Sequence, residues 1–179
     1  MKMRAIASAS VLTLAASSAV AQTQTVALRG DLTPIKLVGG EIVALRTIID
    51  LNNAHAVETI SFLKRNPRGP AEAIPFEING DYQPSLTMRS GADCAVSGTR
   101  VFRDGHILRI VYASRKGEWA DKHTVRFVVF ELTENVEGAP GTPAQYFKER
   151  RAYGSKGAYC DVNRAIETEA SPDGREAGK

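Results

Sequence analysis

Two cysteines are the residues of this sequence whose type most directly suggests chemistry, and each has an aspartate beside it. Asp93 precedes Cys94 in the segment SGADCAVSGTR, and Asp161 follows Cys160 in GAYCDVNRA. Such a pair can be a disulfide, part of a metal site, or a reactive thiol with its partner. The compartment of the protein separates these alternatives, because cysteines pair readily outside the reducing cytosol.

The N-terminal segment has the three parts of a secretory signal peptide. Lys2 and Arg4 give it a positive start, a run of small and apolar residues follows, and residues 19–21 form an A-x-A cleavage signature. The run is shorter than the roughly 20 apolar residues that cross a bilayer. We therefore expect residues 1–21 to be removed and the mature chain to be periplasmic or secreted, without a membrane anchor.

Export favours a disulfide between Cys94 and Cys160. The chain-entropy account gives about 4 kcal/mol for closing a loop of this length, a large share of the ~5–15 kcal/mol that stabilises a typical domain. The bond would also bring Asp93 and Asp161 within reach of each other. Their repulsion must then be relieved by separation, by a basic neighbour or by a bound cation. Arg100 and Arg164 are the candidate basic neighbours.

Motifs for catalysis are weak or missing. Ser61 and Lys64 match the S-x-x-K pattern of serine β-lactamases, which needs a helix to place the two side chains one turn apart. The surrounding segment alternates like a strand, in which these side chains point to opposite faces, and no S-D-N or K-T-G motif follows it. No G-x-S-x-G elbow is present either. The sequence therefore predicts no catalytic site, although a triad assembled from distant residues stays an alternative.

The sequence predicts no metal or cofactor site. His55, His106 and His123 are far apart, and none has a second ligand at the spacing of a zinc motif. The segment DLNNAH (residues 50–55) superficially resembles a calcium loop but lacks its glycine and its distant glutamate. We interpret this segment as a hairpin turn whose asparagines satisfy backbone groups.

The remaining candidates for binding are polar or aromatic side chains at predicted turns and chain reversals. Trp119 lies among charged residues in RKGEWADK, where it can anchor a partner or cap the end of the fold. The formal charge of +3 falls to +1 when Lys2 and Arg4 leave with the signal, so we expect no attraction to nucleic acid or anionic lipid. The expected partner is a small molecule or a periplasmic protein. The candidate binding residues are Asp50, Asn52, Asn53, His55, Asp93, Trp119 and Asp161.

Segments rich in Val, Ile, Phe and Thr recur between turn signals and predict a chain made mainly of short strands. Asn-rich and Asp-Gly turns tolerate the left-handed backbone that tight hairpins need. The expected hairpins join residues 41–51 to 55–65 around Asn52-Asn53-Ala54 and residues 99–103 to 106–114 around Asp104-Gly105, and a further short strand ends at Asn79-Gly80.

Residues 123–134 carry apolar side chains on both faces and are predicted to form a central strand. Residues 161–170 predict a short helix, begun by Asp161 or Asn163. About six to eight strands joined by hairpin turns indicate an antiparallel β-sandwich or small barrel with little helix. We expect one β-rich domain over residues 22–170 and a disordered tail over residues 171–179.

Three segments, IIDLNNAHAVETISF, GADC and YCDVN, resemble the small exported proteins of the carbapenem self-resistance (CarG-like) family. The resemblance covers most of the mature chain, roughly residues 40–165. It implies a non-hydrolytic periplasmic protein that protects its host from a carbapenem, by binding the drug or by shielding a target. Two other hypotheses stay open: an inhibitor of an extracellular enzyme such as a lysozyme, and an unrecognised hydrolase. The segments that carry the resemblance are Asp50-Leu51-Asn52, Asn53-Ala54-His55, Gly91-Ala92-Asp93-Cys94 and Asp161-Val162-Asn163.

Overall fold

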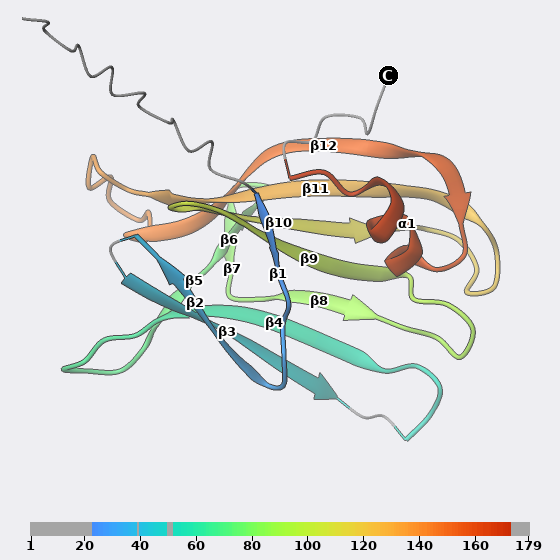
Figure 1. The fold of residues 1–179 in the computed structure, drawn as a ribbon, viewed down its shortest axis with the longest axis horizontal. Helices are drawn as coiled ribbons and strands as arrows, with labels where there is room; N and C mark the ends of the chain where they lie inside the picture. The colour runs from blue at the N-terminus through green and yellow to red at the C-terminus, as the bar shows by residue number, and fades with distance from the viewer. Residues whose placement is uncertain (1–22, 39, 50–51, 173–179) are drawn as a thin grey trace, which may run out of the picture.

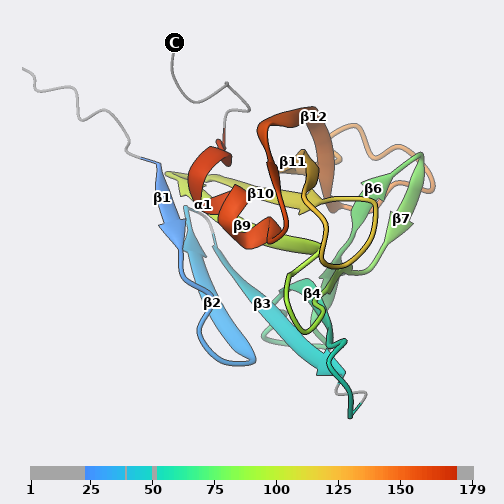
Figure 2. The ribbon, with the colours of Figure 1, turned by 90° about the vertical axis from the view of Figure 1, so that its right-hand side faces the viewer.

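The computed structural model describes residues 23–38, 40–49 and 52–172. The predictions for the signal peptide, for Asp50 and for the tail after Pro172 therefore lie outside the described residues. Two β-sheets pack face to face, and one helix covers the outer face of the larger sheet (Figures 1 and 2). Among the described residues, no helix is long and apolar enough to span a membrane.

The larger sheet has seven strands in the order β1-β9-β10-β11-β12-β6-β7, and the smaller has five, with β2-β3-β4-β5 in line and β8 also paired to β4. All strand pairs are antiparallel except β12 with β6, which run parallel. The strands are β1 (Gln24–Val26), β2 (Leu32–Leu37), β3 (Gly40–Ile49), β4 (Val57–Lys64), β5 (Glu72–Ile74), β6 (Phe76–Ile78), β7 (Asp81–Gln83), β8 (Leu86–Arg89), β9 (Ser97–Asp104), β10 (Ile107–Ser114), β11 (His123–Glu134) and β12 (Gln145–Tyr159); the helix is α1 (Val162–Glu169).

The predicted fold class is confirmed: the chain is a mainly antiparallel β-sandwich with a short C-terminal helix. Both predicted hairpins form, as β3 with β4 and β9 with β10. Their turns contain the left-handed residues that the sequence indicated, Asn52 (φ 52°) and Gly105 (φ 57°). The structure describes twelve strands, more than expected, because short edge strands and the long strand β12 carry little hydrophobic alternation.

Two hydrophobic clusters hold the layers together, and β11 contributes to both. On its inner face, Val128 and Phe130 join the core between the sheets. On its outer face, Phe127 packs with the cluster beneath α1. This double burial confirms the prediction that residues 123–134 form a central strand. The outer cluster contains Phe102, Val111, Ala113, Val125, Phe127, Val129, Val162, Ala165 and Ile166.

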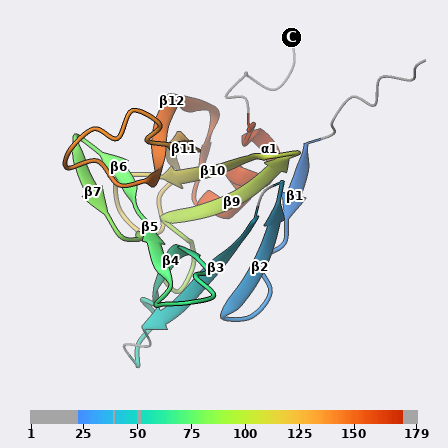
Figure 3. The same cartoon turned by 90° about the vertical axis from the view of Figure 1, so that its left-hand side faces the viewer.

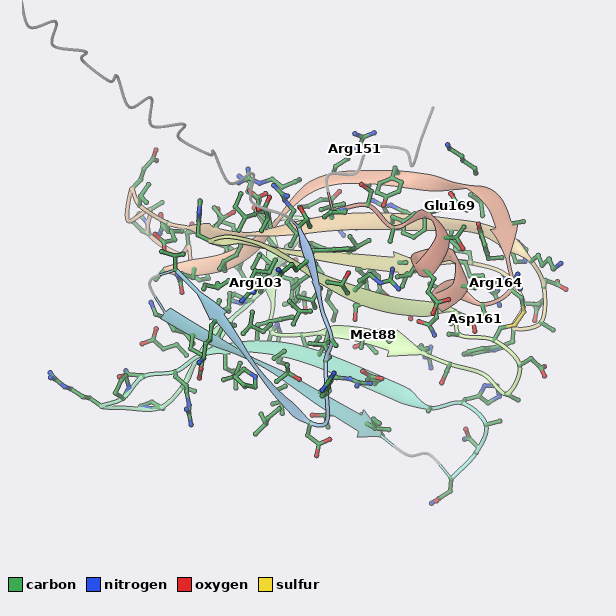
Figure 4. All side chains as sticks on the ribbon, in the orientation of Figure 1. Met88, Arg103, Arg151, Asp161, Arg164 and Glu169 are labelled. Atoms are coloured by element: carbon green, nitrogen blue, oxygen red, sulfur yellow. A yellow bond between two sulfur atoms is a disulfide. The ribbon has the colours of Figure 1, made fainter. Side chains whose placement is uncertain are left out.

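Helix α1 is fastened at both ends. Asp161 is the N-cap residue, and its carboxylate accepts a hydrogen bond from the amide of Asn163 at 2.8 Å. At the other end, Glu169 accepts hydrogen bonds from the Lys156 amide at 2.7 Å and from the Tyr159 hydroxyl at 2.6 Å. Figure 4 shows Asp161 and Glu169 at the two ends of the helix. Strand β12 and the helix are thus connected through one carboxylate.

Glu169 has a lowered pKa, and we predict that its contribution to stability depends on pH. Burial alone raises this pKa, but hydrogen bonds from Tyr159, Lys156 and Gly157 outweigh burial. The stabilisation is therefore complete above the unfolded pKa of about 4.3 and is lost as the pH falls through the lower folded pKa. Glu169→Gln should lower the free energy of unfolding by about 1–2 kcal/mol at pH 7.

Urea unfolding at pH 7 and at pH 3 measures this effect, with Glu167→Gln, an exposed position on the same helix, as the control. The difference between wild type and Glu169→Gln should shrink at pH 3, whereas the control should match wild type at both values. A difference that is equally large at pH 3 would contradict the role assigned to the carboxylate.

Candidate functional site

The predicted disulfide is present and lies at one end of the sandwich. Cys94 and Cys160 are bonded, with their Cα atoms 5.7 Å apart. The bond joins the segment before β9 to the residue before the helix cap, as the sequence predicted. It therefore fixes α1 to the sheet that the helix covers.

Arg115 anchors the loop that follows β10 to this disulfide. Its side chain is buried, and the residue is only 7% exposed. Nε donates to the carbonyl of Cys160 at 2.7 Å, while Nη1 and Nη2 donate to the carbonyls of Glu118 and Trp119. Arg115 was not predicted as a buried anchor, because it is the first of a run of charged residues that has the pattern of a solvent-exposed turn.

Trp119 contacts two segments that are distant in sequence. Its ring lies 4.7 Å from that of His55, centroid to centroid, with the planes tilted by 50°. It also packs on Gly91, where an added Cβ would come within 2.7 Å of Trp119 Cε3. The structure therefore brings together two candidate binding residues, His55 and Trp119, beside the disulfide. The tryptophan is partly exposed, so these contacts leave some of its surface accessible to solvent.

The other candidate residues lie in a turn, on an exposed loop or at the helix cap. The amide of His55 donates to Asn53 Oδ1 at 2.7 Å, which supports the interpretation of this segment as a turn. Asp93 is exposed on the disulfide loop, and Asp161 is occupied as the helix cap. Arg100 donates to the carbonyl of Ile166 at 3.3 Å. Within the described ranges, no three His, Cys, Asp or Glu side chains gather to hold a metal ion.

Next to this end, a cleft of about 400 Å³ opens between the two sheets, and we call it the inter-sheet cleft. Strands β1 and β9 line it from the larger sheet, and β3, β4 and β8 from the smaller one. Its lining includes Ala56, Ser90 and Ala95, which neighbour His55, Gly91 and Cys94 in sequence. The cleft therefore extends from the end of the sandwich that holds the predicted residues.

The cleft exists because the inner face of the smaller sheet is buried at one end of its strands and exposed to solvent at the other. On β3 the inward side chains Ile42 and Ala44 are buried, but Ile48, which follows in the same alternation, is 62% exposed. On β4 the inward Phe62 and Ile60 are fully buried, and Glu58 follows them. Positions that would normally fill the space between two sheets thus open onto solvent.

Arg46 and Glu58 form an ion pair on this inner face. Arg46 Nε lies 2.6 Å from Glu58 Oε1, and the two side chains are 31% and 26% exposed. The hydrogen bond with Glu58 raises the pKa of Arg46 against the opposing effect of burial. The register of the hairpin, in which Ile49 pairs with Val57, places Arg46 diagonally across from Glu58 on the neighbouring strand. Opposite charges at such diagonal positions were the sequence signal for this pair.

The cleft offers both charge and apolar surface. Arg46 faces the cleft beside Glu58, whereas Arg89 lies on the opposite face of β8 from Met88 and Arg100 donates to the Ile166 carbonyl of α1. Met88, labelled between the two sheets in Figure 4, adds apolar surface together with Ile48. This combination suits a small molecule with an apolar body and a negative charge. The described lining residues include no histidine or lysine that could act as a general base. The carboxylate of Glu58 is engaged in the ion pair with Arg46.

Comparison with known proteins identifies a similar fold. A solved structure, described as the crystal structure of CarG, superposes with a TM-score of 0.71 and covers 83% of this chain and 96% of its own. The chain has the fold of CarG. The two sequences are only 16% identical, and no family model or curated protein matches the chain. The predicted resemblance to CarG-like proteins is thus confirmed for the fold. The likeness extends over most of this chain, because 83% of it is covered.

Proposed function

We propose that the protein is an exported, non-enzymatic binding protein that holds a small anionic molecule with an apolar body, and that carbapenems are among its ligands. The observation that carries this proposal is the inter-sheet cleft. There, inward-facing positions of β3 and β4 present an ion pair and the exposed Ile48 to an open space. An unfilled core of this kind is a concave, mostly pre-formed site of the type that small ligands occupy.

The lining supports binding without turnover. Hydrolysis of a lactam needs a nucleophile next to a general base or a metal ion. The serine hydroxyls at the cleft have other partners, since Ser97 Oγ accepts from the Arg89 amide at 2.8 Å and Ser90 Oγ lies 3.5 Å from the Ala56 carbonyl. The carboxylate of Glu58 faces Arg46 rather than a hydroxyl.

The choice of carbapenems rests on the family resemblance and the fold. The segments around residues 50–55, 91–94 and 161–163 resemble the carbapenem self-resistance family, and the sandwich is that of CarG. A carbapenem carries one carboxylate on a compact bicyclic body, which matches the guanidinium group of Arg46 and the apolar Ile48 and Met88 in the cleft. Protection of the host would follow if the protein sequesters the drug before it reaches its target.

A thermal-shift titration with a carbapenem tests this proposal. At 100 times the Kd, binding adds about 2.7 kcal/mol of stability and should raise the Tm by about 5–10 °C, while the lactam absorbance stays constant. Ile48→Trp should fill the cleft and abolish the shift. Val136→Trp, at an exposed loop position, is the matched control and should leave the shift intact.

Three results would contradict the proposal. A shift that survives Ile48→Trp would place the ligand elsewhere, and loss of lactam absorbance with many turnovers would indicate a hydrolase. Tight, salt-resistant inhibition of a lysozyme without any drug-dependent shift would favour an enzyme inhibitor.

A further inference from the structure

We infer that Arg46 is the anion anchor of the inter-sheet cleft and that Glu58 positions it to bind a carboxylate in two-point contact. The inference rests on the proposed function only in placing a ligand in this cleft. It assigns the recognition of the ligand's negative charge to one guanidinium group.

Arg46 uses only a fraction of its hydrogen-bonding capacity within the described part of the protein. An arginine has five N–H donors, and Glu58 accepts from Nε alone, at 2.6 Å. No described residue accepts a hydrogen bond from Nη1 or Nη2 of Arg46. Arg103 provides the contrast, because its Nη1 and Nη2 donate to the Lys36 carbonyl and to Gln24 Oε1, both at 2.9 Å. Of these two inward-facing arginines, Arg46 has the unused pair of donors.

The guanidinium group is also held in place before a ligand arrives. The backbone amide of Arg46 donates to the Asp31 carbonyl at 2.7 Å, which fixes β3 beyond the last residue paired with β2. The pairing of β3 with β4 fixes the position of Glu58, which lies opposite Ile48. A planar donor pair that is oriented in advance loses less entropy on binding than a mobile one.

The surroundings favour a monocarboxylate with an apolar body. Ile48 and Met88 lie on the same inner face as Glu58, one on each side of it, and supply apolar contact. A carboxylate matches the spacing of the two Nη donors, and its single charge suits a site that already contains Glu58. A dianionic phosphate would place a second negative charge near that side chain.

Binding of phenylacetate, of the uncharged phenylacetamide and of a carbapenem tests the inference, measured by NMR titration of the folded protein. Arg46→Lys keeps the charge but loses the donor pair, and it should weaken binding of both carboxylates about 10- to 100-fold. Arg109→Lys is the matched control, because Arg109 Nε also contacts a cross-strand carboxylate, Glu131 at 2.8 Å, away from the cleft. It should change the Kd by less than about twofold. Phenylacetamide should bind more weakly than phenylacetate to wild type and equally to wild type and Arg46→Lys.

Two variants of Glu58 separate positioning from charge. Glu58→Gln keeps an acceptor for Nε and removes a negative charge, so carboxylate binding should stay equal or tighten. Glu58→Leu leaves Arg46 without its support and should weaken binding about tenfold. Equal weakening by both variants would overturn the positioning role.

The outcomes distinguish this inference from the proposed function. If phenylacetate binds through Arg46 and the carbapenem does not bind, the inference stands and the proposed ligand is wrong. If the carbapenem binds equally well to wild type and Arg46→Lys, the proposed function stands and the inference is overturned. If neither carboxylate binds, the inference is overturned.

Discussion

Replacing both cysteines, as Cys94→Ala with Cys160→Ala, is expected to lower the free energy of unfolding by about 2–5 kcal/mol. The bonded residues are 66 positions apart, so the disulfide lowers the conformational entropy of the unfolded chain. Without the bond the unfolded state has more entropy and is favoured. The native contacts of α1 with the sheet should remain, because Val162, Ala165 and Ile166 are buried without help from the sulfurs.

Denaturant unfolding of wild type and of the double variant, each with and without reductant, measures this effect. Reductant should destabilise wild type to the level of the variant and should not affect the variant itself. A wild type whose stability is indifferent to full reduction would contradict the prediction.

Arg115→Met is expected to cost about 2–4 kcal/mol and to release Trp119 from its position. The substitution leaves the carbonyls of Cys160, Glu118 and Trp119 without their buried donor. Trp119 is the single tryptophan of the chain, so its fluorescence reports on this loop alone. We expect the emission to shift to longer wavelength as the ring becomes more exposed.

Lys116→Met, at the exposed neighbouring position, is the control and should leave both stability and emission near the wild-type values. If Arg115→Met also leaves the emission unchanged, Arg115 does not hold the loop.

Local signals in the sequence were sufficient for the turns and for the central strand. The Asp104-Gly105 turn needs only its two residues and the alternation on either side of it. Strand β11 was recognisable because both of its faces are apolar. Strand β12 was missed because most of its middle residues are exposed on both faces, so its side chains show no alternation.

The candidate site was predictable only in part. The disulfide was predicted from composition and from the expectation of export, and Trp119 stood out as an aromatic residue among charges. The contact of Trp119 with His55 depends on how two loops meet in space, which no local pattern encodes. The Arg46–Glu58 pair was overlooked because charged residues in an amphipathic strand are normally assigned to the solvent face.

Because β6 pairs in parallel with β12, the larger sheet cannot be completed before the last strand is in place. Figure 3 shows the β6–β7 hairpin beside β12, although the hairpin comes from the first half of the chain and β12 is the last strand. Phe76 on β6 pairs with Phe147 on β12, and their rings stack 4.9 Å apart in the core. Contacts between such distant residues slow folding, because the chain must close a long loop before they form. Until β12 is in place, one edge of β11 and the face of Phe76 that stacks on Phe147 stay uncovered, so a chain lacking its last strand is expected to aggregate rather than fold.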